Sequence, residues 1–254
     1  MVGDAPAGPS RRVLLIGGTS EIGLAILRRL AADGPVHPYL LGRDRDRLES
    51  ALASLRAAGA EPGEVAVLDA DDLGSHEPAI ATAFERGGPF DVAVLAVGVL
   101  GAQEALDSDR DEALRVMRVN FVGSGSLLLA CMRALRAAGG GAMVVLSSVA
   151  AERPRSGNAI YGAAKAGLDA LSQGLADAAG GGVRVLVVRP GFVPTRMTAG
   201  LPATPFATTP EAVAEATASG LASTAHTVWV PSTLRYVFSV LRHLPRPIYR
   251  RLPL

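Results

Sequence analysis

The chain has 254 residues, 49% of them hydrophobic, which is enough to fill one large α/β core, and we expect a single domain over residues 1–254. Its 25 basic and 24 acidic residues nearly balance, so charge gives no general argument for nucleic-acid binding. The single cysteine, Cys131, excludes an intramolecular disulfide, and four scattered histidines without ligand spacing argue against a metal site.

Short apolar runs alternate with longer amphipathic segments from residue 12 to about 190. This alternation predicts an α/β fold, a doubly wound parallel sheet with helices on both faces. Because leucine and β-branched residues fill the runs, the strands should be buried on both sides. The predicted strands are residues 12–17, 35–42, 64–69, 91–98, 141–148, 183–191 and 227–232.

The loop "IGGTSEIG" (16–23) follows the first predicted strand and precedes a helix. In a doubly wound sheet, this turn holds the pyrophosphate of a dinucleotide. Gly17 allows a tight turn, Thr19 and Ser20 offer hydroxyl groups, and Gly23 lets helix and strand pack closely. The N-terminus of the helix then faces the phosphates.

After the second predicted strand, Gly42 and Arg43 occupy the position that meets the adenosine ribose. A carboxylate there favours the free 2'-hydroxyl of NAD, whereas a guanidinium pairs with the 2'-phosphate of NADP. Arg43 therefore favours NADP, and NAD stays open. The alternative is that Arg43 simply begins a solvated, charged helix with Asp44.

The stretch "YGAAKAG" (161–167) holds the only lysine of the chain, while the other 24 basic residues are arginines. Tyr161 and Lys165 are four residues apart, so they share one face of a predicted helix. A nearby ammonium lowers the pKa of a phenol toward neutrality, and we expect Lys165 to do so here. Ser148 ends a strand thirteen residues earlier, and helix capping is the more natural role for its neighbour Ser147.

Two segments near the end of the chain depart from the strand and helix alternation. The Pro- and Thr-rich segment 192–215 predicts a surface loop that covers the site as a lid, with a helix starting near Thr209 or Pro210. The tail, 233–254, mixes apolar residues with five arginines and no acid, which is typical of a membrane-surface segment. A core or dimer helix with a basic end is the alternative.

The motifs resemble those of the short-chain dehydrogenase/reductase family over residues 12 to about 200. The resemblance implies a Rossmann fold and an NAD(P)-dependent oxidoreductase that acts on CH–OH groups. The chain departs from the family pattern at Ile16, at Glu21, and at Leu95 and Ala96, where the family has two asparagines. We expect the Glu21 carboxylate to turn outward or to contact a neighbouring loop.

The resemblance also implies a role for each catalytic residue. Ser148 would polarise the substrate carbonyl, Tyr161 would donate the proton, and Lys165 would contact the nicotinamide ribose. Asn120 matches an asparagine whose carbonyl holds a proton-relay water; an asparagine that satisfies a backbone kink is the alternative.

The resemblance places the cofactor contacts on both halves of the chain. Asp69 would meet the adenine amino group, and Thr195 would bind the nicotinamide carboxamide. The implied contacts are Gly17, Thr19, Ser20, Ile22, Gly23, Arg43, Asp69, Ala70, Gly98, Tyr161, Lys165, Pro190, Gly191, Val193 and Thr195.

Within that family, "VLLIGGTSEIGLAI", "YGAAKAGLDA" and "LRYVFSVLRHLPRPIYRRLPL" resemble the decaprenylphospho-β-D-erythro-pentofuranosid-2-ulose 2-reductases. This implies reduction of the 2-keto group of decaprenylphospho-2-keto-erythro-pentofuranose to decaprenylphospho-arabinofuranose, for cell-wall arabinan synthesis. It also implies a flavin oxidase as partner, a homo-oligomer, and a cytoplasmic protein peripheral at the inner face of the cell membrane. The start of the chain does not resemble a signal peptide, and no long apolar run predicts a membrane span.

Two other functions stay open from the sequence. One is the same chemistry on a soluble hydrophobic ketone. The other is a non-catalytic, nucleotide-sensing scaffold for a membrane oxidase, although a sensor has no need of a proton donor.

Overall fold

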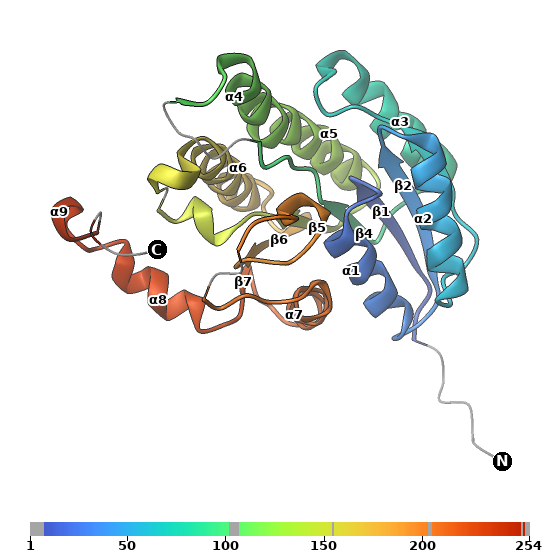
Figure 1. Ribbon diagram of the computed structural model, residues 1–254. Coiled ribbons are helices and arrows are strands. Elements are labelled where there is room, and N and C mark those ends of the chain that lie inside the picture. Colours follow the sequence, from blue (N-terminus) through green and yellow to red (C-terminus); the bar gives the residue numbers. More distant parts are fainter. Residues whose placement is uncertain (1–7, 102–106, 154, 203–204, 250, 252–254) are drawn as a thin grey trace.

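The computed structural model describes residues 8–101, 107–153, 155–202, 205–249 and 251, and it is built on one sheet of seven parallel strands (Figure 1). The strand order β3-β2-β1-β4-β5-β6-β7 confirms the predicted doubly wound fold. The order reverses between β1 and β4, which places a crevice at the carboxyl ends of these strands. The strands are β1 (Arg11–Ile16), β2 (Val36–Gly42), β3 (Glu64–Val67), β4 (Val92–Leu95), β5 (Gly141–Leu146), β6 (Val183–Pro190) and β7 (Thr227–Val230).

Helices cover both faces of the sheet (Figure 1). One face carries α1 (Glu21–Ala31), α2 (Arg45–Ala57) and α7 (Pro210–Ala222), and the other carries α3 (His76–Gly87), α5 (Ser124–Ala137) and α6 (Ala159–Ala178). Successive residues of β1 alternate between the two cores: Val13 and Leu15 pack under α1, whereas Leu14 and Ile16 pack under α5. The continuous apolar runs therefore mark strands covered on both sides.

Helix α5 continues from α4 (Arg110–Met117) through a π-helical turn, η3 (Arg118–Gly123). In the described part of the chain, Arg110–Ala137 is the one helical stretch long and apolar enough to cross a bilayer, and 56% of its apolar window is buried inside the protein. Because α5 packs against the sheet, its apolar character is that of a core helix. The π turn interrupts the α-helical ladder beside the crevice.

The loop after β6 ends where Thr209 caps α7 by accepting the N–H of Ala212 at 3.1 Å, with Pro210 at the first helical position. The predicted helix start is confirmed, and the predicted lid boundary at residue 215 falls inside α7. Of the predicted tail, Arg250 and residues 252–254 lie outside the described residues.

The described part of the tail forms α8 (Leu234–Leu241) and α9 (Arg246–Tyr249), here called the C-terminal arm, which extends away from β7 (Figure 1). The arm contacts the segment that follows Ser148. The Arg153 side chain donates to the main-chain oxygen of Leu241, and its guanidinium lies 3.8 Å from the ring centroid of Tyr249. The arm is therefore attached to the domain at its far end as well as at β7.

Candidate functional site

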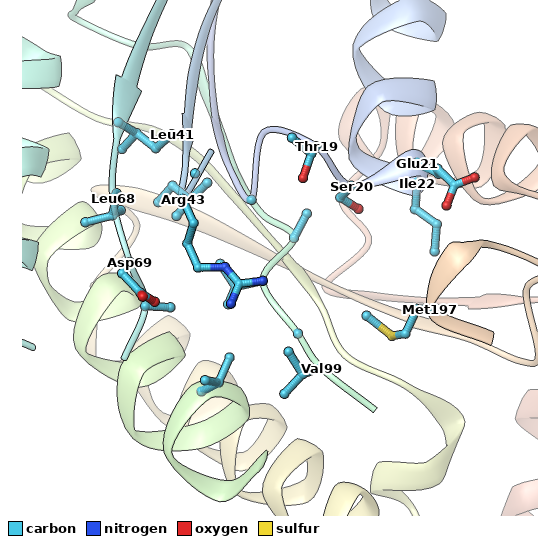
Figure 2. A pocket seen from close by; sticks show the side chains of 18 of the residues that line it. Thr19, Ser20, Glu21, Ile22, Leu41, Arg43, Leu68, Asp69, Val99 and Met197 are labelled. Atoms are coloured by element: carbon cyan, nitrogen blue, oxygen red, sulfur yellow. The ribbon is translucent and has the colours of Figure 1, made fainter. Parts of the chain in front are cut away.

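A cavity of about 350 Å³ opens at the carboxyl ends of β1, β2 and β4, where the strand order reverses (Figure 2). Ligands of doubly wound sheets bind at this position. The predicted cofactor residues that line it are Gly17, Thr19, Ser20, Ile22, Arg43, Asp69, Ala70, Gly98 and Thr195. The structure thus brings residues from both halves of the chain to one cavity.

The glycine loop shapes one end of this cavity. Gly17 has a φ of 91°, and a Cβ there would lie 2.7 Å from the main-chain oxygen of Ala96. A Cβ at Gly23 would lie 2.7 Å from the Leu15 side chain, so helix and strand pack as closely as predicted. The Ser20 hydroxyl caps α1 by accepting the N–H of Gly23 at 3.2 Å. The first N–H groups of α1 and the positive end of its dipole therefore face the cavity.

The other end of the cavity is basic. Figure 2 shows the Arg43 side chain extending from the end of β2 into the cavity, beside Asp69. Asp44 caps α2 by accepting the N–H of Arg47 at 3.1 Å, and α2 begins at Arg45. The alternative that Arg43 begins this helix is therefore wrong. Arg47 lines the same wall, and sequence reasoning missed it because nothing in its spacing sets it apart from other helix arginines.

Six predicted cofactor residues are not among the residues that line the cavity, namely Gly23, Tyr161, Lys165, Pro190, Gly191 and Val193. The last three shape the turn after β6. Pro190 ends β6, and a Cβ at Gly191 would lie 2.9 Å from the Leu234 side chain. Val193 is buried, and its main-chain oxygen accepts the hydroxyl of Thr198 at 2.7 Å. These contacts fix the turn that leads to Thr195.

The predicted catalytic serine and tyrosine meet. The Ser148 hydroxyl lies near the phenol of Tyr161 and acts to lower its pKa. It also accepts the N–H of Ala150 at 3.1 Å, which caps η4 (Val149–Ala151). The prediction that Ser147 is the capping residue is wrong. Ser147 instead donates to Asp169 Oδ2 at 2.6 Å, because its side chain points to the opposite side of the chain into the protein.

Lys165 is 3% exposed, and its Nζ donates to the main-chain oxygens of Leu146 at 2.9 Å and Val97 at 3.3 Å. Burial lowers the pKa of Lys165 to about 8, although Asp169 opposes this. Burial also raises the pKa of Tyr161 to about 12. The prediction that Lys165 lowers the pKa of the phenol is therefore wrong for the chain by itself, because desolvation dominates and main-chain carbonyls hold the ammonium.

Asn120 lies in the π turn and is fully buried. Its side-chain amide accepts the N–H of Val99 at 2.9 Å and donates to the main-chain oxygen of Val99 at 2.7 Å. It thereby holds the loop in which residues 95–96 replace the family's asparagines. A Cβ on Gly98 would lie 3.1 Å from Asn120 Oδ1 and 3.5 Å from Lys165 Nζ, so both side chains lie close to Gly98, which lines the cavity. The kink and the side-chain bonds are observed, and the relay role stays a prediction.

A buried ionic cluster, missed by sequence reasoning, lies under these residues. Arg189 on β6 donates to Asp169 at 2.7 and 2.9 Å and pairs with Glu152 at 2.6 Å. Asp169 follows Lys165 by one helical turn, and its partner Ser147 is next to the catalytic serine. The cluster therefore connects the two segments that carry the catalytic groups. Among the residues described, no group of three or more His, Cys, Asp or Glu side chains is placed to hold a metal ion.

Glu21 faces the loop after β6, so the expected contact with a neighbouring loop is confirmed. Its Oε2 accepts the main-chain N–H of Arg196 at 2.7 Å, and the Arg196 guanidinium donates to the main-chain oxygen of Thr19 at 2.6 Å. Arg196 and Met197 line the cavity and were also missed, because a surface arginine in a long loop carries no spacing signal.

Comparisons with known proteins agree on one family. The family model for short chain dehydrogenase matches residues 11–205. The chain is 45% identical over 251 residues to an uncharacterized oxidoreductase of Mycobacterium tuberculosis, covering 98% of this chain and 99% of the relative. It is also 45% identical over 252 residues to an uncharacterized oxidoreductase of Streptomyces coelicolor, covering 97% of both.

Solved structures of oxidoreductases share the fold of this chain. A variant of actinorhodin polyketide ketoreductase with NADPH matches with a TM-score of 0.77 and 26% identity, covering 89% of this chain and 97% of that one. An alcohol dehydrogenase from Thermococcus sibiricus, complexed with 5-hydroxy-NADP, matches with a TM-score of 0.77 and 26% identity, covering 87% and 96%.

Proposed function

The chain belongs to the short-chain dehydrogenase family and is an NAD(P)-dependent oxidoreductase acting on CH–OH groups; we propose that it reduces a ketone and that Tyr161 is the proton donor. The pairing of Tyr161 with Ser148, beside the buried Lys165, carries the proposal. A phenol whose pKa is about 12 is protonated at neutral pH, as a proton donor must be.

The residues around the cavity fit a nicotinamide dinucleotide. The N-terminus of α1, capped by Ser20, offers N–H groups to a diphosphate, and Gly17 keeps side chains away from that end. Arg43 and Arg47 offer guanidinium groups to a 2'-phosphate. Bound here, the nicotinamide supplies the hydride that reaches the carbonyl carbon.

Each catalytic side chain then has a separate task. The Ser148 hydroxyl donates a hydrogen bond to the substrate carbonyl oxygen and holds it beside the phenol. Tyr161 passes its proton to that oxygen as negative charge develops there. Lys165 places a positive charge near the phenolate that results. Because an ammonium has three donors, Lys165 can also meet a ribose hydroxyl besides its two main-chain carbonyls.

We expect ketone reduction to slow as the pH rises above about 8. Burial lowers the pKa of Lys165 to about 8 and raises that of Tyr161 to about 12, so Lys165 is the first of the two to lose its proton. The measurement is kcat/KM for ketone reduction from about pH 6 to about pH 10, with cofactor saturating. A rate that stays level across this range contradicts a requirement for the ammonium.

We expect Arg43→Ala to raise the Kd for NADPH about tenfold or more and to leave the Kd for NADH unchanged, because only NADPH carries the 2'-phosphate. Nicotinamide fluorescence titrations measure both constants. Arg45→Ala is the matched control, since the Arg45 side chain is exposed on α2 and pairs with Glu49. Equal weakening for both cofactors, or a wild-type preference for NADH, refutes the assignment of Arg43.

As substrate we propose the 2-keto group of decaprenylphospho-2-keto-erythro-pentofuranose, reduced to decaprenylphospho-arabinofuranose. The motif resemblance supports this substrate, and so does the distribution of apolar side chains around the site. The turn after β6 and the C-terminal arm meet at Gly191, which lies against Leu234 and the main-chain oxygen of Phe206. Large apolar side chains on these two segments are exposed, namely Met197, Leu201, Phe206, Tyr236, Val240 and Ile248.

The proposed substrate also implies a membrane surface as the place where the protein binds it. A polyprenyl phosphate lies in a bilayer, and the arm combines the exposed Tyr236 and Val240 with Arg235 and Arg242. We therefore propose peripheral attachment to an anionic membrane surface on the cytoplasmic side. The flavin oxidase that would form the ketone is proposed as a partner on the same surface, and a homo-oligomer on the resemblance alone.

The second candidate is a soluble hydrophobic ketone, which the fold similarity to actinorhodin polyketide ketoreductase favours. The experiment follows NADPH absorbance with the lipid-linked 2-keto-pentose in anionic vesicles and with a panel of soluble hydrophobic ketones that carry no lipid phosphate. We expect turnover of the vesicle substrate, and a loss of this activity when residues 234–254 are removed. Turnover of the soluble ketones alone, unaffected by the truncation, overturns the lipid-linked assignment.

A further inference from the structure

Glu21 and Arg196 join two segments that are far apart in the sequence. Glu21 Oε2 accepts the main-chain N–H of Arg196 at 2.7 Å and lies 3.4 Å from Arg196 Nε. The Arg196 guanidinium reaches past Glu21 to the main-chain oxygen of Thr19, at 2.6 Å. All three residues line the cavity, and Figure 2 shows Glu21 on the side of the turn that carries Met197. The contact therefore joins two segments that line the cofactor cavity, the start of α1 and the loop after β6.

The turn that Glu21 holds is already ordered by its own bonds. Thr195 donates its N–H to the Thr198 hydroxyl at 2.9 Å, and that hydroxyl donates to the main-chain oxygen of Val193 at 2.7 Å. These hydrogen bonds hold residues 195–198 together as one structural unit. Because Glu21 binds the main chain of this unit, it sets the position of Thr195 relative to the end of α1.

Charge explains why this carboxylate needs a partner. Glu21 is the first residue of α1, whose N-terminus faces the proposed diphosphate site, and a free carboxylate there would repel a diphosphate. Arg196 neutralises Glu21 and adds a guanidinium to the cavity wall. Exposed ion pairs by themselves contribute little, and Glu21 and Arg196 are 39% and 55% exposed. The bond to the main-chain N–H is what distinguishes this pair from an ordinary surface ion pair.

We infer that Glu21 and Arg196 form a latch that holds the turn 195–198 over the diphosphate and nicotinamide half of bound NAD(P). Arg196 is the cation that faces the diphosphate, and Glu21 is a positioning residue that acts through Arg196. The inference rests on the proposed use of NADP.

The test compares NADP with a ligand that lacks the part of the cofactor that the latch covers. Kd values are measured by calorimetry for NADP and for adenosine 2'-monophosphate, which lacks the diphosphate and the nicotinamide half. We expect Glu21→Ala and Arg196→Gln each to weaken NADP binding about tenfold and to leave binding of the monophosphate unchanged. Glu21→Gln, which keeps an acceptor for the Arg196 N–H, should restore much of the affinity. Glu49→Ala, at an exposed pair with Arg45, is the control.

The sign of the Glu21→Ala effect decides between two roles. If Glu21 is only a repelling charge, its removal tightens NADP binding, and the latch is refuted. Equal weakening of NADP and the monophosphate also refutes it, because the damage is then general. Wild-type protein that binds neither ligand refutes the proposed NADP use itself, whereas normal wild-type binding with unaffected variants refutes the latch alone.

Discussion

Tyr161→Phe is expected to lower the rate of ketone reduction about a thousandfold while the Kd for NADPH stays unchanged. The variant keeps the ring and its packing and loses only the hydroxyl that lies near Ser148. Because burial holds the phenol protonated to a pH of about 12, this hydroxyl is the group in the site that is ready to give a proton at neutral pH. Single-turnover absorbance measures the chemical step directly.

Tyr236→Phe is the matched control, because Tyr236 is 71% exposed on the arm and lies away from the catalytic pair. It should keep full activity on a soluble ketone. Retention of full activity by Tyr161→Phe would remove the mechanism, whereas a loss of NADPH binding in that variant would show that the hydroxyl serves cofactor binding and not only proton transfer. The two measurements together separate catalysis from cofactor binding.

The sheet could be predicted from the sequence because its cause is local. Residues 13–16 and 185–188 are continuous apolar runs, and such runs form strands when both faces are covered. The catalytic set was predictable for a similar reason, since Tyr161 and Lys165 share a helix face at a fixed spacing. The seven strands and the proximity of Ser148 and Tyr161 are observed as these patterns predict.

The ionization of the site could not be predicted, because it depends on burial. The spacing of Tyr161 and Lys165 indicates that they are neighbours, but it does not show that Leu146 and Val97 offer carbonyls to the ammonium. Those carbonyls come from two strand ends that only the folded sheet brings together. The prediction that Lys165 lowers the pKa of Tyr161 is wrong for that reason.

Long-range polar contacts were missed for a related reason. Glu21 and Arg196 are separated by 175 positions, and no periodic pattern connects them. Glu21 stands out in the sequence because the family has a glycine at this position. Arg196 and Arg47 resemble any surface arginine of an arginine-rich chain. Departures from a known motif therefore gave the one usable signal for a tertiary contact.

Arg189→Met is expected to destabilise the protein by about 3–5 kcal/mol, because it leaves buried carboxylates without their cation. Arg189 is 11% exposed, and Asp169 and Glu152 are 5% and 6% exposed. For a chain of this length the loss corresponds to a fall in Tm on the order of 10 °C. Methionine keeps most of the side-chain volume, so the effect reports charge more than packing. Differential scanning calorimetry measures the change.

The pH dependence distinguishes lost charge pairing from lost packing. In the wild type, burial opposes ionization of Asp169, but hydrogen bonds from Arg189 and Ser147 outweigh it and hold its pKa below the usual value. Without Arg189 the pKa of Asp169 rises, so the folded variant takes up a proton more readily than the unfolded chain as the pH falls. The Tm difference from wild type should therefore narrow toward about pH 5. Arg133→Met, at an exposed pair with Glu77, should leave Tm unchanged, and a pH-independent deficit in Arg189→Met would assign the loss to packing.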